Sequence, residues 1–382
     1  GTLVGIGGSI WLSMCLGQKN EKRASQILYN SFVMLVVLSV CLILGFILLK
    51  HNLIYWFGGS DALYPYANTY LTIYTLGTFF ALMSIGLNYF ITGQGYATIA
   101  MLSVCIGAIT NIIFDFILIR TLKIGVAGAA IGTVVAQFIS CMFVLCFLRF
   151  KSKIKLHKEE LSIEKMKHIV KLGFSPFLII ASDSIILIVM NMMLQKYGGN
   201  MGDIYISAIT VAQSYFLLIT GPLLGISSGT QPIFAYHFGS QNLKKIKEAF
   251  KIVISFAFLF CLIMFIISMC YSNVFVAMFT NDAMTMPIAD RAIKIFCLGI
   301  LMMSIQYVLV DGITGLSNVK LSLFLSLNRK LMYLGCTCLL PAFLGVSNIF
   351  YAQPTADIYA SIVTIICFIK IIPSYLKSHG VK

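Results

Sequence analysis

Long apolar stretches, each of a length that can cross a lipid bilayer, recur from one end of the chain to the other. A transmembrane helix needs about 20 mostly apolar residues, whereas the strands of a membrane β-barrel are shorter and alternate in polarity. Hydrophobic residues make up 59% of the chain and charged residues only 10%, which excludes a soluble enzyme, a disordered scaffold and a coiled coil. We therefore predict an all-α membrane protein, a polytopic bundle of transmembrane helices. The predicted spans are 3–17, 26–49, 66–92, 97–119, 124–148, 173–195, 204–236, 252–275, 292–314, 320–344 and 347–373.

The 27 Lys and Arg residues are distributed unequally between alternate loops. One set of loops contains 19 of them, eight within residues 149–171, and the opposite set contains six. Loops rich in Lys and Arg stay on the cytoplasmic side. We therefore predict a multi-pass protein of the cytoplasmic membrane with a cytoplasmic C-terminus. Membrane topology then accounts for the net charge of +14, and we expect the lipid bilayer, not nucleic acid, as a partner.

The two halves of the chain match each other at a fixed offset of 222 residues. Residues 7–23 align with 229–245, and residues 91–93 (Ile-Thr-Gly) align with 313–315 without a gap. A constant register over separated blocks indicates an internal repeat. Because both halves have the same predicted topology, the repeat is a parallel one, as in some classes of transporter.

The segment 149–172 is the longest polar stretch and separates the two halves. We interpret it as a cytoplasmic amphipathic linker between an N-lobe, 1–148, and a C-lobe, 173–382. Residues 1–17 have the pattern of the end of a membrane helix that enters a basic loop. We therefore expect one further helix in front of residue 1, so that each complete lobe would contain six helices.

Asp115 is the strongest candidate for a functional residue inside a span. Asn111 precedes it by four residues, which places both side chains on one face of a helix. An amide oxygen and a carboxylate together suit Na⁺ or a proton. A structural aspartate at the outer end of the helix is the alternative.

Three further acids lie within or beside predicted spans, where ionisable groups are costly and are candidates for function. Asp183 and Asp311 could attract a cationic substrate or carry a proton into a cavity, whereas we interpret Asp357 as a structural or capping residue. Gln231-Pro232 interrupts another span, and its amide and any carbonyl freed by the proline could face the same cavity. Packing contacts are the alternative for each of them.

Motifs for other kinds of chemistry are absent from the sequence. The 11 cysteines lie mostly in apolar stretches and do not form a zinc signature. No P-loop, GxSxG or HExxH motif is present. We therefore expect neither an enzyme nor a bound cofactor, and no metal other than a coupling Na⁺.

Several blocks of the sequence resemble the multidrug and toxic compound extrusion (MATE) family, and in particular its MepA-like bacterial branch. The likeness covers nearly the whole chain in family order. Its most specific parts are GAAIGTVVAQ and GISSGTQPIFAYHFG, accompanied by GIGGSIWLSMCLGQKNEKRA, NIIFDFILI, LGFSPFLI, NMMLQKYGG and YAQPTAD.

The resemblance implies a fold of 12 helices in two six-helix lobes, of which this chain would begin inside the second helix. It also implies export of drugs and organic cations in exchange for Na⁺ or H⁺. In several members an N-lobe cation site combines a helix-1 Asp with residues that match Asn111, Asp115 and Thr133 here. Acids on helices 7 and 10 act in other branches, and Asp183 and Asp311 lie on those helices. The chain departs from the family pattern at Arg329-Lys330, in the middle of a predicted span.

Our interpretation is a monomeric secondary antiporter that exports small organic cations or drugs by alternating access. Asn111, Asp115 and Thr133 would bind the coupling Na⁺ or H⁺, and Asp183, Gln231 and Asp311 would line the substrate cavity. Two alternatives remain. One is a flippase for lipid-linked oligosaccharide from the same superfamily, which would use several Arg or Lys residues in the cavity; the other is a membrane sensor or partner protein that transports nothing.

Overall fold

The computed structural model describes residues 1–56, 64–280 and 282–381, and within these ranges the chain is helical and contains no strand. This confirms the all-α prediction. The chain forms two compact units, Gly1–Phe174 and Ser175–Lys382. The boundary falls inside a long helix, α6 (Ile163–Gly198), so the polar segment 149–172 belongs to the first unit.

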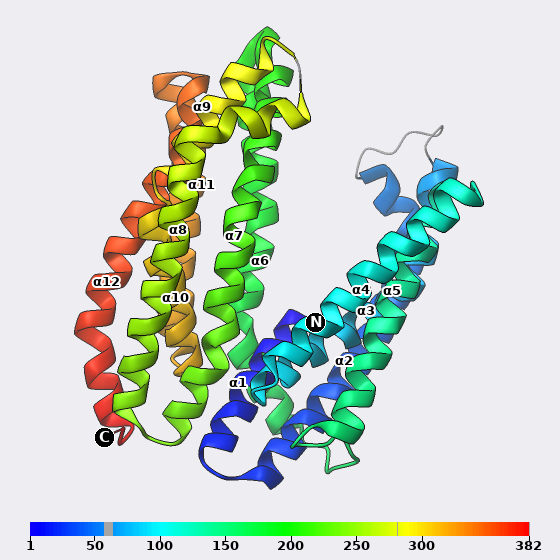
Figure 1. Cartoon of the computed structure of the whole chain (residues 1–382), viewed down its shortest axis with the longest axis vertical. Coiled ribbons are helices and arrows are strands. Elements are labelled where there is room, and N and C mark those ends of the chain that lie inside the picture. The colour runs from blue at the N-terminus through cyan, green and yellow to red at the C-terminus, as the bar shows by residue number, and fades with distance from the viewer. Residues whose placement is uncertain (57–63, 281, 382) are drawn as a thin grey trace. The chain divides into compact units, whose positions relative to one another are not determined.

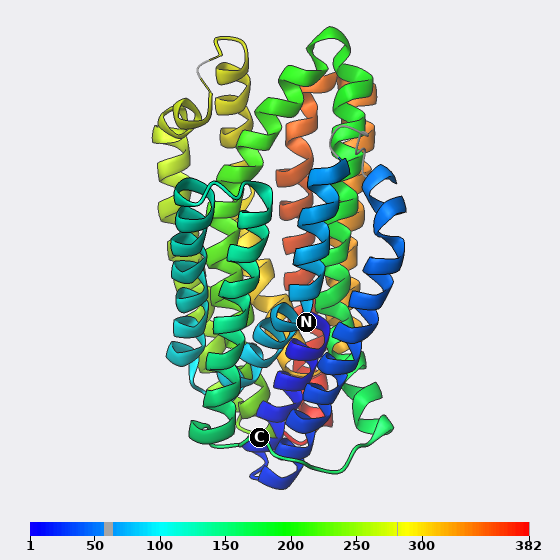
Figure 2. The same cartoon turned by 90° about the vertical axis from the view of Figure 1, so that its right-hand side faces the viewer.

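Unit 1 is built around α3, which packs against α1, α2 and α5, while α4 packs mainly against α5 (Figures 1 and 2). Short π-helical turns extend α4 and α5 at their C-terminal ends. The elements are α1 (Thr2–Gly17), α2 (Glu21–Trp56), α3 (Tyr64–Gly93), α4 (Ala97–Asp115), η1 (Phe116–Thr121), α5 (Val126–Cys146) and η2 (Phe147–Lys151).

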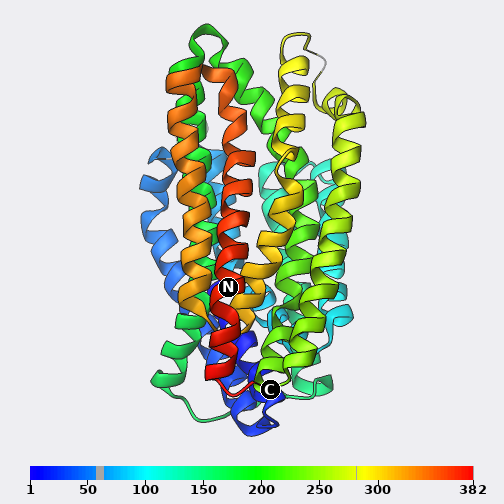
Figure 3. The same cartoon turned by 90° about the vertical axis from the view of Figure 1, so that its left-hand side faces the viewer.

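Unit 2 is centred on α10, which contacts α7, α8, α11 and α12 (Figure 3). The core is apolar and tightly packed, and Phe234, Phe296 and Phe350 are among its largest buried side chains. The elements after α6 are η3 (Gly199–Met201), α7 (Gly202–Gly239), α8 (Leu243–Phe279), α9 (Thr285–Cys297), α10 (Ile300–Gly315), α11 (Val319–Leu344), η4 (Val346–Tyr351) and α12 (Ala352–Ser378).

Each of the 11 predicted spans coincides with a helical segment, but one of them is broken. The stretch 292–314 falls on α9 and α10, which meet at an angle of 49°. In the described residues, eight helices are long and apolar enough to cross a membrane, and this bent pair is a ninth candidate. The other two predicted spans fall on α1, which has 16 residues, and on α11, which contains Arg329 and Lys330.

The offset of 222 residues relates the turns of the two halves as well as their helices. Backbone φ is positive at Lys19 and Gln241, at Gly95 and Ser317, and at Lys123 and Gly345. The residue after the first pair caps the next helix in the same way in each half, since Asn20 Oδ1 accepts from Arg23 N and Asn242 Oδ1 accepts from Lys245 N, both at 3.0 Å. The repeat seen in the sequence is therefore a repeat of backbone conformation.

The segment between η2 and α6 is held against unit 1 by side-chain amides. Gln94 Oε1 accepts from Ile154 N at 2.7 Å, and Asn30 Oδ1 accepts from Ser162 N at 2.8 Å. Asn30 also donates to the carbonyl of Glu160 at 2.9 Å. These bonds satisfy backbone groups that have no helical partner, and they fix where α6 begins.

Candidate functional site

The first candidate site lies between α4 and α5, where the structure brings Asn111, Asp115 and Thr133 together. Asn111 and Asp115 share one face of α4, and Asn111 Nδ2 donates to Thr133 Oγ1 of α5 at 3.4 Å. Thr133 in turn donates to the carbonyl of Ala129 at 3.0 Å. This leaves the side-chain oxygen of Asn111 and one lone pair of Thr133 Oγ1 available to a ligand.

Unlike Asn111 and Thr133, Asp115 has a buried side-chain oxygen, Oδ1, that has no hydrogen-bond partner among the residues that the structure describes. It lies against Gly132 of α5, where a Cβ atom would collide with Oδ1. A buried carboxylate oxygen without a donor is unfavourable unless a cation or proton satisfies it. The turn that follows Asp115 is π-helical, a feature frequent at functional sites.

Gln137 is a polar residue near this site that the sequence reading missed. It follows Thr133 by four residues and therefore lies on the same face of α5. Its Oε1 is also buried without a partner in the described part of the chain. We use the name α4–α5 polar cluster for Asn111, Asp115, Thr133 and Gln137.

The second candidate site lies within unit 2, where Gln231 of α7 and Asp311 of α10 meet. Gln231 Nε2 donates to Asp311 Oδ1 at 2.8 Å. Asp311 Oδ2 is buried and has no partner among the described residues. A small cavity of about 50 Å³ adjoins Asp311 and is also lined by Tyr307, Arg329 and Lys330. The structure thus joins two of the predicted cavity residues directly.

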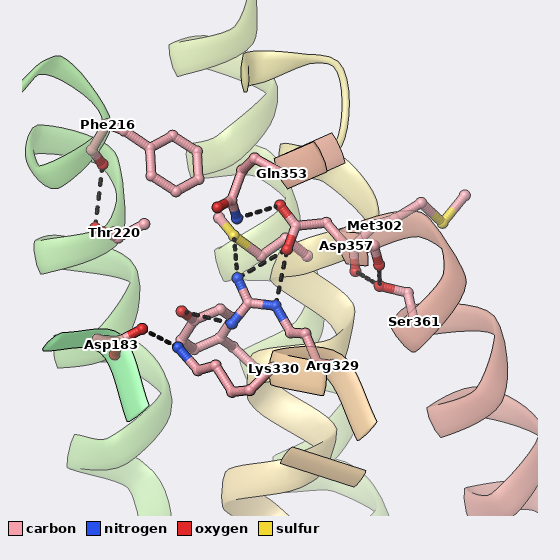
Figure 4. Close-up of polar contacts among 11 residues, drawn as sticks. Asp183, Phe216, Thr220, Met302, Arg329, Lys330, Gln353, Asp357 and Ser361 are labelled. Carbon is pink, nitrogen blue, oxygen red and sulfur yellow. Dashed lines mark hydrogen bonds and ion pairs between the residues drawn. The ribbon is translucent and has the colours of Figure 1, made fainter. Parts of the chain in front are cut away.

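Arg329 of α11 forms a buried ion pair with Asp357 of α12 (Figure 4). Its Nε donates to Asp357 Oδ1 at 2.8 Å, and its guanidinium also donates to Tyr307 at 3.1 Å. Gln353 Nε2 donates to Asp357 Oδ2 at 2.9 Å. The Asp357 side chain is 0% exposed. Asp357 is therefore the partner of a buried cation and caps no helix.

Lys330 of α11 forms an ion pair with Asp183 of α6 (Figure 4). The Lys330 side chain is 9% exposed, whereas that of Asp183 is 58% exposed. Both line a cavity of about 320 Å³ that Phe216 and Tyr333 also line; we call it the unit-2 cavity. The lining of this cavity contains one carboxylate, Asp183, and two cations, Arg329 and Lys330, each of which is paired with an aspartate.

The two repeats contain different chemical groups at equivalent positions. At the offset of 222, Asp115 aligns with Thr337 and Asn111 with Tyr333; conversely, Arg329 aligns with Gly107 and Asp311 with Tyr89. Each site therefore occurs in only one half. In the described residues, no group of three or more His, Cys, Asp or Glu side chains is placed to hold a metal ion.

Known proteins resemble this chain over most of its length. The multidrug export protein MepA of Staphylococcus saprophyticus subsp. saprophyticus is 26% identical over 310 residues, which cover 80% of this chain and 68% of that protein. The protein of the same name from Staphylococcus haemolyticus is 24% identical over 365 residues, covering 94% and 78%.

Solved structures share the fold. A crystal structure of MATE in the bent conformation superposes with a TM-score of 0.92 at 22% identity, and it covers 100% of this chain and 85% of that one. The sequence profile of the MatE family matches residues 1–117 and 180–333, well over half of the chain. This protein therefore belongs to the MatE family of multi-pass membrane transporters.

Proposed function

We propose that the protein is a secondary antiporter that exports drugs or organic cations in exchange for Na⁺ or H⁺. The observation that carries this proposal is the buried, unpartnered Asp115 Oδ1 beside Asn111 and Thr133. A carboxylate, an amide oxygen and a hydroxyl are the ligands that a hard monovalent cation prefers, and a proton would satisfy Asp115 equally. The related MepA proteins are named as multidrug exporters.

The substrate would bind in the unit-2 cavity, whose volume of about 320 Å³ lies at the lower end of the range for drug-sized ligands. Aromatic faces attract organic cations, and Phe216, Tyr307 and Tyr333 line the cavity together with the carboxylate of Asp183. Asp311 adjoins the smaller cavity next to Tyr307. An amphipathic cation would find aromatic contact there and the partly exposed carboxylate of Asp183, while Arg329 and Lys330 in the same lining are each paired with an aspartate.

Exchange requires that the coupling ion and the drug stabilise different states of the transporter. Each ligand can shift the equilibrium only by its difference in affinity for the two states, and the coupling is reciprocal. Occupation of the α4–α5 polar cluster would favour one state, and occupation of the unit-2 cavity would favour the other. The separation of the two sites into different halves of the repeat suits this division of roles.

Asp115→Asn is expected to reduce gradient-driven efflux of ethidium from proteoliposomes at least about tenfold, because the amide can neither carry a proton nor neutralise a cation. Efflux is measured under an imposed Na⁺ gradient and, separately, under an imposed pH gradient, which identifies the ion. The matched control is Asp282→Asn. Asp282 is an exposed acid outside both sites, so this variant should retain efflux. If Asp115→Asn retained full efflux, we would assign the coupling role to Asp183 or Asp311 instead.

A flippase for lipid-linked oligosaccharide is the second candidate, because Arg329 and Lys330 line the unit-2 cavity and could contact a pyrophosphate. The two functions predict opposite effects of Lys330→Met. If the substrate is a cation, removing Lys330 frees Asp183 and should tighten ethidium binding about three- to fivefold, since a partly exposed charge contributes up to about 1 kcal/mol. Fluorescence titration of detergent-solubilised protein measures this. Unchanged or weaker ethidium binding, with a lost affinity for pyrophosphate, would favour the flippase.

A further inference from the structure

A third cavity, outside both candidate sites, lies in unit 1 and is lined by residues of α1, α2 and α6. Its volume is about 330 Å³. Four cationic side chains, Arg23, Lys165, Lys167 and Lys171, line it together with Trp11 and His168. We call it the Trp11 cavity. On the topology predicted from loop charge, it lies at the cytoplasmic end of unit 1.

Aromatic rings form the wall of the Trp11 cavity. Trp11 is only 6% exposed, and the ring of His168 lies 4.4 Å from it, measured between centroids. The guanidinium carbon of Arg23 lies 5.2 Å from the centre of the Trp11 ring, a cation–π contact that limits where this charge can be. The cavity thus has one cation placed against a buried aromatic ring, and the side chains of Arg23, Lys167 and Lys171 are exposed, so a ligand can reach them.

Few carboxylates among the described residues offset the positive charge of the Trp11 cavity. Arg23, Lys165, Lys167 and Lys171 form no ion pair with any residue in the described ranges. Glu164 is the one carboxylate that lines the cavity, so the lining has a net charge of about three positive units at neutral pH. Lys165 instead donates to the neutral amide oxygen of Gln26 at 2.7 Å.

Two nearby acids, Glu21 and Glu159, are paired with residues outside the cavity. Glu21 pairs with Lys153 at 2.9 Å, and Glu159 lies 2.9 Å from His157. The uncompensated charge is concentrated on one stretch of helix, because Lys167 and Lys171 are four residues apart and share a face of α6. Repulsion between such like charges is unfavourable unless an anion lies among them.

We propose that the Trp11 cavity binds a phosphate group, in the form of an anionic phospholipid headgroup or a soluble phosphate. Ammonium and guanidinium donors are the usual partners of phosphate oxygens. Basic pockets at the cytoplasmic ends of transmembrane helices bind anionic headgroups, and tryptophan favours the headgroup level of a membrane. The cavity is also roomy enough for more than the phosphate itself, since a water molecule occupies only about 30 Å³.

Retention of phospholipid by the full chain tests the proposal. Protein purified in detergent is incubated with phosphatidylglycerol or with phosphatidylcholine, and bound lipid is counted by native mass spectrometry. The triple variant Arg23→Gln/Lys167→Gln/Lys171→Gln is expected to lose retention of phosphatidylglycerol at least about tenfold. Lys244→Gln/Lys247→Gln/Lys251→Gln removes the same charge from exposed positions outside the cavity and should retain phosphatidylglycerol.

Tryptophan fluorescence distinguishes the two sources of phosphate. The chain has two tryptophans, so Trp56→Phe leaves Trp11 as the sole indole reporter. Inorganic phosphate, added at constant ionic strength against chloride, should change the Trp11 emission saturably, and the triple cavity variant should abolish this change. Such a response without preference for phosphatidylglycerol assigns the site to soluble phosphate. A preference for phosphatidylglycerol that depends on the cavity assigns it to the lipid headgroup.

Two results would overturn the proposal. Equal loss of phosphatidylglycerol in the cavity variant and in its matched control would show that only the overall charge attracts the lipid. No preference for phosphatidylglycerol, together with no phosphate-dependent change in Trp11 emission, would leave the cavity without a phosphate ligand of either kind.

Discussion

Arg329→Met is expected to lower the free energy of unfolding by about 3–5 kcal/mol, because it leaves a fully buried carboxylate without its cation. The Asp357 side chain is 0% exposed and that of Arg329 is 9% exposed, so water cannot replace the lost partner. The Tyr307 hydroxyl also loses the guanidinium that donates to it, and Gln353 alone continues to donate to the Asp357 carboxylate among the described side chains. Thermal and denaturant unfolding in detergent micelles, followed by circular dichroism, measures the loss.

Two further variants separate the cost of an unpaired charge from the loss of packing. Arg329→Met/Asp357→Leu removes both charges and is expected to recover most of the stability, since replacing a buried pair by apolar residues is often neutral or stabilising. Lys330→Met breaks the adjacent pair and should cost less than about 1 kcal/mol, because Asp183 is 58% exposed. Equal losses for Arg329→Met and Lys330→Met, or no recovery in the double variant, would contradict the buried-pair interpretation.

The helices could be predicted from the sequence because the signal that defines a membrane span is local. About 20 apolar residues in a row are enough to predict a membrane helix without reference to its neighbours, although α2, α6, α7 and α8 extend beyond the predicted spans. The break between α9 and α10 could not be predicted in this way. At Gly299 a Cβ would lie 2.9 Å from Cα of Pro354 and 3.0 Å from Cβ of Asp357, so the bend depends on the close approach of α12.

The number of residues between two site residues also determined whether their contact could be predicted from the sequence. Asn111 and Asp115 are one helical turn apart, so their shared helix face could be expected from spacing, whereas Thr133 was indicated only by the resemblance to the family. The pair of Arg329 with Asp357 joins two helices, and nothing in the sequence around Asp357 indicates a cationic partner.

The pair of Lys330 with Asp183 spans 147 residues. In the sequence these two residues stood out separately, Asp183 as an acid within a span and Lys330 as a departure from the family pattern. Their contact depends on how α6 and α11 pack in three dimensions, which is why the sequence showed two costly charges and the structure shows one ion pair.

The internal repeat describes the backbone better than it describes the side chains. Gly95 aligns with Ser317 and Lys123 with Gly345, and each pair has positive φ although the residues differ. A positive φ is easier for glycine than for serine or lysine, so the sign of φ was retained at turns where residue identity was lost. The two halves therefore share a similar course of the backbone. The α4–α5 polar cluster lies in the first half, and the Arg329–Asp357 pair lies in the second.

Gly7→Ala is expected to lower the free energy of unfolding by about 3 kcal/mol, since it adds a methyl group where two backbones touch. A Cβ at Gly7 would lie 2.7 Å from the nitrogen and 3.1 Å from Cα of Gly173 on α6, and closer still to the carbonyl oxygen of Ile169. Backbone atoms cannot move aside as a flexible side chain can. Unfolding of the purified variant in detergent measures the effect.

Gly229→Ala is the matched control, because Gly229 occupies the position of Gly7 in the second repeat. A Cβ there meets no atom within 4 Å, and it lies inside α7, where alanine is favoured over glycine by about 1 kcal/mol. We expect Gly229→Ala to be neutral or slightly stabilising. If the two variants lost stability equally, the cost would come from glycine removal itself and not from the contact between α1 and α6. A loss of stability in Gly7→Ala alone would show that the glycine, although present in both halves, is required for helix packing only in unit 1.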